Sequence, residues 1–176
     1  MTEFFQRYTA PDPAALIQDI ERSRGALSTA QVEGNALLVI ERAGELAGML
    51  TTARHEAEAR QLLEPLQSAV EDHLSREPAG WYYLAFGTAS QYLGLRIEAN
   101  ALFTRALKLA RTHAWEHLEH FVLQHWGRSL VEEGEFFRAR ECFNEALAIR
   151  ERLNEPRASS TRRALEELRT LESRMP

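Results

Sequence analysis

Residues 126–147 read WGRSLVEEGEFFRARECFNEAL, and this stretch decides the fold because a similar one precedes it. Forty residues earlier, residues 86–107 read FGTASQYLGLRIEANALFTRAL. Both stretches have a glycine after a large aromatic residue, an alanine four residues before a phenylalanine, and a closing Ala-Leu pair. Residues 46–67 follow the same order of small and large apolar residues in a degenerate form. A period of this length predicts an array of stacked units.

The whole chain is predicted to be helical, because apolar residues recur three and four positions apart and no alternating β-branched run predicts a strand. Ser28 or Thr29 is expected to cap the second helix, and Ser159 or Ser160 the last. Pro65 lies inside the third helix, where we expect a kink in a helix that continues. Breakers and caps place the helices at about 14–27, 28–52, 54–75, 79–94, 97–112, 115–133, 136–153 and 159–173.

The recurring small residues predict how the helices of each unit pack. Gly87 and Gly127 lie on the first helix of a pair, where the missing Cβ allows another backbone to approach closely. Ala99 and Ala139 do the same on the second helix, and Phe103 and Phe143, four residues later on the same face, are expected to fill the space that these small residues open. Each helical hairpin leaves an apolar side exposed, so neighbouring hairpins must stack to bury it.

These residues resemble the tetratricopeptide repeat (TPR), in the order Trp126, Gly127, Leu130, Ala139, Phe143 and Ala146. The earlier copy departs from the pattern at Ser90, where a large apolar residue is usual. Residues 146–156 are similar to the long-helix variant found in kinesin light chain and in many bacterial repeat proteins. The resemblance covers residues 40–156 and implies an all-α fold: a right-handed α-α superhelix of about three helical hairpins.

The flanks are expected to cap this array. The expected parts are an N-terminal segment and capping helix at 1–27, hairpins at about 28–78, 79–114 and 115–156, and a capping helix at 157–176. Leu165, Leu168 and Leu171 give the last helix one apolar side, which suits a cap. Three apolar residues lie near the N-terminus: Phe4, Phe5 and Tyr8. We expect them to pack onto the first hairpin, to lie in the groove or to contact a second subunit.

Charge and cysteine content exclude several classes of function. The 176 residues carry a formal charge of −5, which gives no electrostatic surface for nucleic acid. The first residues include Glu3 and Arg7 and no apolar run, so no signal peptide is expected, and no window reaches the ~18 apolar residues of a membrane span. The single cysteine, Cys142, cannot form an internal disulfide and is expected to be buried. These features predict a cytoplasmic protein.

The family resemblance implies a concave groove, lined by the first helix of each hairpin, that binds a protein or peptide segment. Chaperone-docking members clamp a terminal carboxylate with Lys and Asn, which Gly44, Leu84 and Gln124 replace here, so that function is not expected. By repeat phase, the first copy contributes Glu41, Gly44, Glu45, Gly48 and Thr52. The residues expected to bind the partner in the later copies are Trp81, Leu84, Thr88, Tyr92, Phe121, Gln124 and Arg128.

Aromatic side chains and arginine most often dominate binding energy, which is why this set is favoured. Trp81 and Phe121 have an alternative role, which is to pack between neighbouring first helices. Arg128 is the better candidate for a contact, because an arginine on an inner surface requires a carboxylate or a ligand.

Two other classes of function remain as alternatives. His117 and His120 share a helix face and can present two imidazoles to a metal or small molecule, but no third ligand of comparable quality is identifiable. A homodimer through exposed helix faces or the Phe4–Tyr8 segment is the other alternative. There is no phosphate-binding glycine loop, nucleophile elbow or zinc-type cysteine pair, so we expect a non-catalytic scaffold without cofactor or metal.

Overall fold

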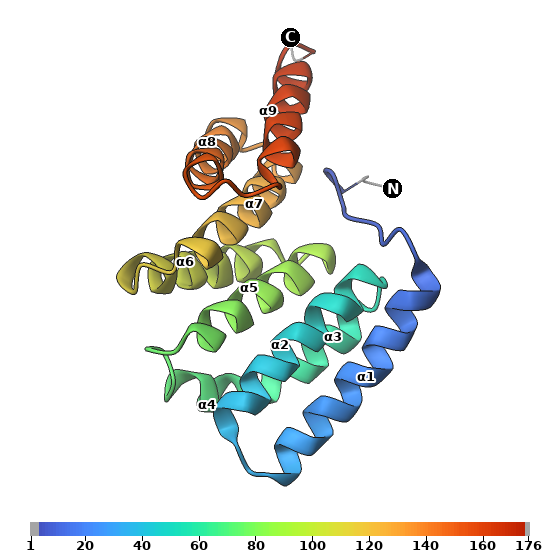
Figure 1. Cartoon of the computed structure of the whole chain (residues 1–176). Coiled ribbons are helices and arrows are strands. Elements are labelled where there is room, and N and C mark those ends of the chain that lie inside the picture. The colour runs from blue at the N-terminus through green and yellow to red at the C-terminus, as the bar shows by residue number, and fades with distance from the viewer. Residues whose placement is uncertain (1–3, 175–176) are drawn as a thin grey trace. The chain divides into compact units, whose positions relative to one another are not determined.

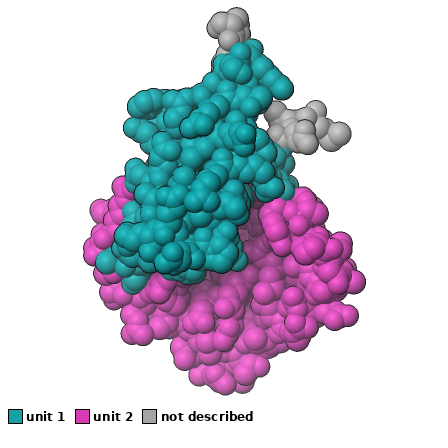
Figure 2. Space-filling view, turned by 45° about the horizontal axis from the view of Figure 1, so that its top comes forward, with its two compact units in different colours: residues 1–7, 114–176 teal, residues 8–113 magenta. Residues whose placement is uncertain are grey.

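The computed structural model describes residues 4–174, which are all-helical and contain no strand. The predicted all-α fold class is therefore confirmed. The chain divides into two compact units: unit 2 is residues 8–113, and unit 1 is residues 1–7 with 114–176 (Figure 2). Within the described residues, none of the helices combines the length and the apolar character that crossing a membrane requires.

In unit 2, α2 packs against α1, α3 and α5, while α5 packs against α6 (Figure 1). The predicted hairpins at 28–78 and 79–114 correspond to α2 with α3 and to α5 with α6. Tyr82 is fully buried, and its hydroxyl donates to the Leu63 carbonyl oxygen at 3.1 Å. The elements are α1 (Pro13–Val32), α2 (Ala36–Thr52), α3 (Glu56–Leu63), the 3-10 helix η1 (Glu64–Leu66), α4 (Gln67–Glu71), α5 (Glu77–Tyr92) and α6 (Arg96–Thr112).

Unit 1 contains α7 (Glu116–Glu132), α8 (Phe136–Arg152) and α9 (Ala158–Glu172), and α8 packs against both of the others. The α7–α8 hairpin matches the predicted third hairpin. Leu165 and Leu168 of α9 are buried, and Leu171 is half-buried. Cys142 is buried on α8, which confirms its predicted packing role.

The same backbone turn ends successive helices. Positive φ angles recur at Arg54, Gly94 and Gly134, and again at Ala114 and Asn154, so each series advances by 40 residues. One residue after the first series, an N–H donates to the carbonyl oxygen five positions back: His55 to Leu50, Leu95 to Ser90 and Glu135 to Leu130. This is the Schellman arrangement, in which a left-handed residue ends a helix. The period predicted from the sequence is thus present in the backbone of both units.

The two glycine–phenylalanine pairs pack in the same way in each unit. A Cβ on Gly87 would lie 3.0 Å from the Phe103 ring, and a Cβ on Gly127 would lie 2.6 Å from Cε1 of Phe143. Each glycine therefore makes room for an aromatic ring. This corrects the expectation that these two glycines allow a close approach of another backbone.

The first helix boundary differs from the prediction. α1 continues through Ser28 and Thr29, and Thr29 Oγ1 donates to the Gly25 carbonyl oxygen at 3.1 Å instead of capping α2. Asn35 is the cap, since its side chain accepts from the Leu38 N–H at 3.1 Å. The helix continues to Val32 and ends before Gly34, whose φ is +68°.

Two further boundaries also need correction. The predicted third helix is interrupted at Pro65 by η1, as a residue without an N–H would cause, but helical structure then ends at Glu71 and not near 75. At α9 neither Ser159 nor Ser160 caps the helix, because their hydroxyls donate to the carbonyl oxygens of Pro156 and Arg157.

Candidate functional site

Four of the predicted partner contacts lie on α5 of unit 2. Trp81 is half-buried, with its Nε1 donating to Glu77 Oε1 at 3.1 Å, and Tyr92 is also half-buried. Leu84 and Thr88 are only 5% and 7% exposed, and Thr88 Oγ1 donates to the Leu84 carbonyl oxygen. Trp81 and Tyr92 therefore retain surface that a partner can reach, whereas Leu84 and Thr88 have little.

The other three predicted contacts lie on α7 of unit 1. Phe121 and Arg128 are half-buried. Gln124 is 2% exposed, and its Oε1 accepts from Arg150 at 3.0 Å and from the Thr161 hydroxyl at 2.7 Å. Gln124 therefore links α7 to α8 and α9. The predicted set is divided between the two units, four residues in one and three in the other.

Arg150, which the sequence analysis did not find, is the largest fully buried side chain and is 1% exposed. Its Nε donates to His120 Nδ1 at 3.2 Å, and its guanidinium lies over the Phe121 ring, 5.7 Å from the centroid. Its Nη1 lies within hydrogen-bond distance of Gln124 Oε1, the Arg157 carbonyl oxygen, Ser160 Oγ and Thr161 Oγ1. We call Arg150, His120, Gln124 and Thr161 the Arg150 cluster.

A signal for this cluster was present in the sequence. Arg150 lies 40 and 80 residues after Ala110 and Val70, which occupy the same repeat position and are fully buried. Burial and the neighbouring Arg128 lower the pKa of Arg150 to about 10, so it still carries its charge at neutral pH. A charged group at a buried position requires hydrogen-bond acceptors, and the cluster supplies them.

The structure brings a carboxylate to the predicted histidine pair. His117, His120 and Glu155 place one ligand atom each within 4.8 Å of one another, and His120 Nε2 lies 3.4 Å from His117 Nδ1. Glu155 is the third candidate ligand that the sequence analysis did not identify. Its position in the turn after α8 gives no periodic signal.

The hydrogen bonds of His120 disfavour a metal ion there. The Arg150 Nε–H is always a donor, so His120 Nδ1 must accept and the single proton of the neutral ring lies on Nε2. That nitrogen then has no lone pair for a metal. Burial, and next the charge of Arg150, lower the pKa of His120 to about 4, so the ring is neutral at pH 7. The group forms a hydrogen-bonded chain from Arg150 through His120 to His117.

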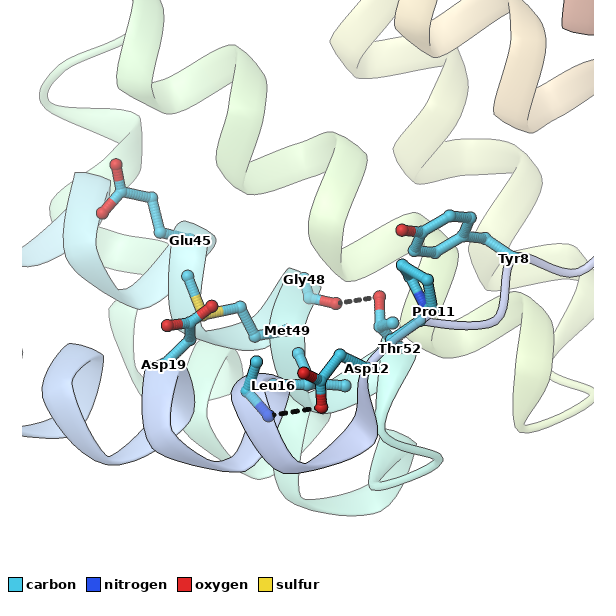
Figure 3. Close-up of a pocket in the computed structure, with 11 residues that line it drawn as sticks. Tyr8, Pro11, Asp12, Leu16, Asp19, Glu45, Gly48, Met49 and Thr52 are labelled. Atoms are coloured by element: carbon cyan, nitrogen blue, oxygen red, sulfur yellow. Dashed lines mark hydrogen bonds between the residues drawn. The ribbon is translucent and has the colours of Figure 1, made fainter.

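Unit 2 contains an open cleft of about 440 Å³ between α1, α2 and the segment that precedes α1 (Figure 3). Glu45, Gly48 and Thr52 of α2 line it, and these are three of the five positions that the repeat phase predicted to face the groove. Of the other two, Gly44 is buried against α5, where a Cβ would lie 3.8 Å from the Tyr82 backbone. The prediction for Gly44 is therefore corrected, and Glu41 lies outside the residues that line the cleft.

The residues near the N-terminus are divided between the units. The Phe5 N–H donates to Glu132 Oε1 at 3.1 Å, and the Phe5 ring centroid lies 6.2 Å from that of Phe143. Phe5 therefore packs on the α7–α8 hairpin of unit 1, and not on the first hairpin. Phe4 lies under the Arg7 guanidinium, whereas Tyr8 is 59% exposed and lines the cleft of unit 2.

Comparison with known proteins adds no family assignment. Neither the protein-family models nor the curated protein sequences contain a match to this chain.

Proposed function

We propose that this chain is a TPR-like scaffold, a right-handed α-solenoid that binds a segment of a partner protein and has no catalytic activity or cofactor. The proposal is supported by the turn and the glycine–phenylalanine pair that recur every 40 residues. The observation that carries it is the open cleft on α2. Glu45, Gly48 and Thr52 line that cleft, and the repeat phase assigns the same positions to a groove.

A scaffold of this kind binds by displaying a surface that is already folded. The helix ends are held by backbone hydrogen bonds, as at His55 and Leu95, and the hairpin interiors are closely packed. A partner segment then orders only itself, which lowers the entropic penalty of association. The single, buried cysteine suits a reducing compartment, so the proposal places the scaffold in the cytoplasm.

Among the predicted contacts, those that retain exposed surface are the ones we assign to the partner. Trp81, Tyr92, Phe121 and Arg128 are half-buried, so each offers part of its side chain. Aromatic and arginine side chains at interfaces often contribute ~2 kcal/mol or more each. Leu84, Thr88 and Gln124 are buried and are therefore not assigned to the partner.

The test is selection of a random peptide display library on the purified full chain, followed by calorimetric titration of the enriched peptides. Arg128→Glu is expected to weaken binding at least about tenfold while leaving the melting temperature nearly unchanged. Arg152→Glu is the matched control, because Arg152 is 55% exposed and its ion pair with Glu116 lies at the surface. Failure to enrich any peptide, or unfolding of Arg128→Glu, would contradict this assignment.

Self-association is a second candidate, because two large apolar side chains are exposed at the same repeat position. Ile97 is 90% exposed and Phe137, 40 residues later, is 68% exposed. Sedimentation over a hundredfold concentration range is the measurement. A species that stays monomeric throughout would remove this candidate, and dissociation of a dimer by Ile97→Ser or Phe137→Ser would support it.

A further inference from the structure

The cleft between α1 and α2 combines an apolar floor with a negative rim. Leu16 of α1 and Met49 of α2 face it together with Gly48 (Figure 3). A Cβ placed on Gly48 would meet no atom within 4 Å, so the space above this glycine is open. The volume of about 440 Å³ lies within the range of about 300–1,000 Å³ typical of ligand sites.

One end of the cleft is closed by the segment before α1. Tyr8 and Pro11 lie together there, and the Tyr8 ring is 59% exposed (Figure 3). Asp12 holds the start of α1, because its Oδ1 accepts from the Ala15 N–H at 3.0 Å. This bond fixes the end of the closing segment next to Pro11, and Arg54 Nη2 donates to Thr9 Oγ1, next to Tyr8, at 3.1 Å. Two hydrogen bonds therefore hold the segment that carries the aromatic wall.

All the charged residues that line the cleft are acidic: Asp12, Asp19 and Glu45. Asp19 is bonded to Arg22, and Glu45 accepts from Arg42 at 2.8 Å. Both pairs are ion pairs within one helix turn, and Arg22 and Arg42 lie outside the lining. Exposed pairs of this kind are worth only ~0–1 kcal/mol, so a cation from another molecule can replace either arginine.

We infer that this cleft receives the side chain of a lysine or arginine carried by the partner segment. The alkyl chain of such a residue lies along Leu16, Met49 and the open face of Gly48, and its cationic end reaches the carboxylates of Asp19 and Glu45. Long basic side chains bury their methylene groups in this way while the charge stays at a polar rim. The inference rests on the proposed function in one respect, which is that a partner segment supplies the basic side chain. The chemistry of the cleft does not depend on that function.

The chemistry of the lining disfavours acidic and purely aliphatic side chains. An acidic side chain would meet the carboxylates of Asp19 and Glu45 with no base in the lining. A purely aliphatic side chain would cover the floor but would form no ion pair at the rim. A basic side chain satisfies both parts of the cleft.

The first experiment uses a probe of one side chain. The full chain, labelled with ¹³C at its methionine methyl groups, is titrated with Nα-acetyl-lysine N-methylamide and followed by NMR. Met49 is one of three methionines, so its signal is easily assigned. We expect a saturable shift of the Met49 methyl signal, and binding at least about threefold weaker for the norleucine analogue, which has the same alkyl chain without the charge.

Variants then test the contributions of the apolar floor and of the acidic rim separately. Gly48→Leu fills the open space and is expected to abolish the Met49 shift, while the unchanged amide spectrum elsewhere confirms folding. Asp19→Asn with Glu45→Gln is expected to make the lysine and norleucine probes equal. Glu21→Gln is the matched control, because Glu21 is 70% exposed on the same helix and does not line the cleft.

The outcomes distinguish this inference from the proposed function. Absence of a saturable Met49 shift, or equal binding of the lysine, norleucine and glutamate analogues to the wild-type chain, overturns the inference. If the peptide library enriches segments without a lysine or arginine preference, the scaffold function stands and the inference falls. If the lysine probe binds as expected and no peptide is enriched, the cleft chemistry stands and the scaffold function falls.

Discussion

The α5–α6 hairpin of unit 2 and the α7–α8 hairpin of unit 1 have the same local geometry and different interiors. Both have a left-handed residue in the loop, Gly94 or Gly134, and a glycine that accommodates a phenylalanine ring. At two further repeat positions the α5–α6 hairpin has Leu84 and Ala110, and the α7–α8 hairpin has Gln124 and Arg150. An apolar pair in one hairpin is a polar, charged pair in the other.

This difference shows that the backbone of the hairpin forms with either apolar or polar side chains at the positions of Gln124 and Arg150. What the polar pair requires is a neighbour with acceptors, and the first turn of α9 supplies them through the Arg157 carbonyl oxygen and the hydroxyls of Ser160 and Thr161. The α7–α8 hairpin is thus joined to α9 by directional hydrogen bonds. Such bonds specify one placement of the helix more strictly than apolar packing does.

The largest expected effect comes from removing the charged residue of this pair. Arg150→Ala leaves a cavity and leaves His120 Nδ1 buried without its donor, while Gln124 Oε1 keeps only the Thr161 hydroxyl, so it should lower the free energy of unfolding by about 2–5 kcal/mol. Urea unfolding measures this loss. Arg152→Ala, two residues later and exposed, should change the free energy by less than about 1 kcal/mol. Equal effects of the two substitutions would show that the cluster is not stabilising.

The next effect is a pH dependence confined to the polar hairpin. Burial and Arg150 lower the pKa of His120 from 6.5 to about 4, so between these values the unfolded chain binds a proton that the folded chain does not. Stability from this group is therefore complete above about pH 6.5 and is lost as the pH falls, by about 2 kcal/mol between pH 7 and pH 5. Burial also lowers the pKa of His125, to about 3, so this group contributes a loss of similar size over the same pH range. His120→Gln keeps an acceptor for Arg150 and should therefore remove about half of the total slope.

A smaller effect compares the two glycine positions directly. Gly127→Ala places a Cβ 2.6 Å from the Phe143 ring and should cost about 1–2 kcal/mol, because the ring must shift. Gly87→Ala, where the nearest atoms are 3.0 Å away, should cost less than about 1 kcal/mol. Gly48→Ala meets nothing and should stabilise α2 by about 0.5–1 kcal/mol. Thermal unfolding of the three variants checks the order, and a reversed order would contradict the packing described here.

The smallest effect concerns the turns that the hairpins share. Ala114 has a φ of +55°, where an alanine is strained, and it occupies the repeat position of Asn154. Ala114→Gly should therefore stabilise the chain by about 0.5–1 kcal/mol, despite the greater freedom of glycine in the unfolded state. Asn154→Gly should have a smaller effect, because asparagine tolerates this conformation better. A loss of stability in Ala114→Gly, measured by urea unfolding, would argue against the left-handed turn.

The candidate site could be predicted only in part. Repeat phase placed Glu45, Gly48 and Thr52 on a surface that the structure opens as a cleft. The same reasoning predicted that Gln124 faces the groove, whereas the structure shows this side chain buried and hydrogen-bonded inside unit 1. The prediction failed because repeat phase identifies a helix face and not what covers that face. The closing wall of the cleft, at Tyr8 and Pro11, follows no period, so the sequence singled out Tyr8 by its apolar character but left its place open between three alternatives.

The sequence by itself determined the helices, the 40-residue period, the Gly–Phe pairs and the buried positions of Cys142 and Leu168, because each depends on spacing along one helix or between adjacent helices. Only the tertiary structure decided that Arg150 would be buried against His120, that Glu155 would join the two histidines and that Phe5 would pack on Phe143. These contacts join residues about 30 to 140 positions apart in the chain. Short-range periodicity carries no information about such pairs, and their energies depend on which acceptors and rings the packed helices bring within reach.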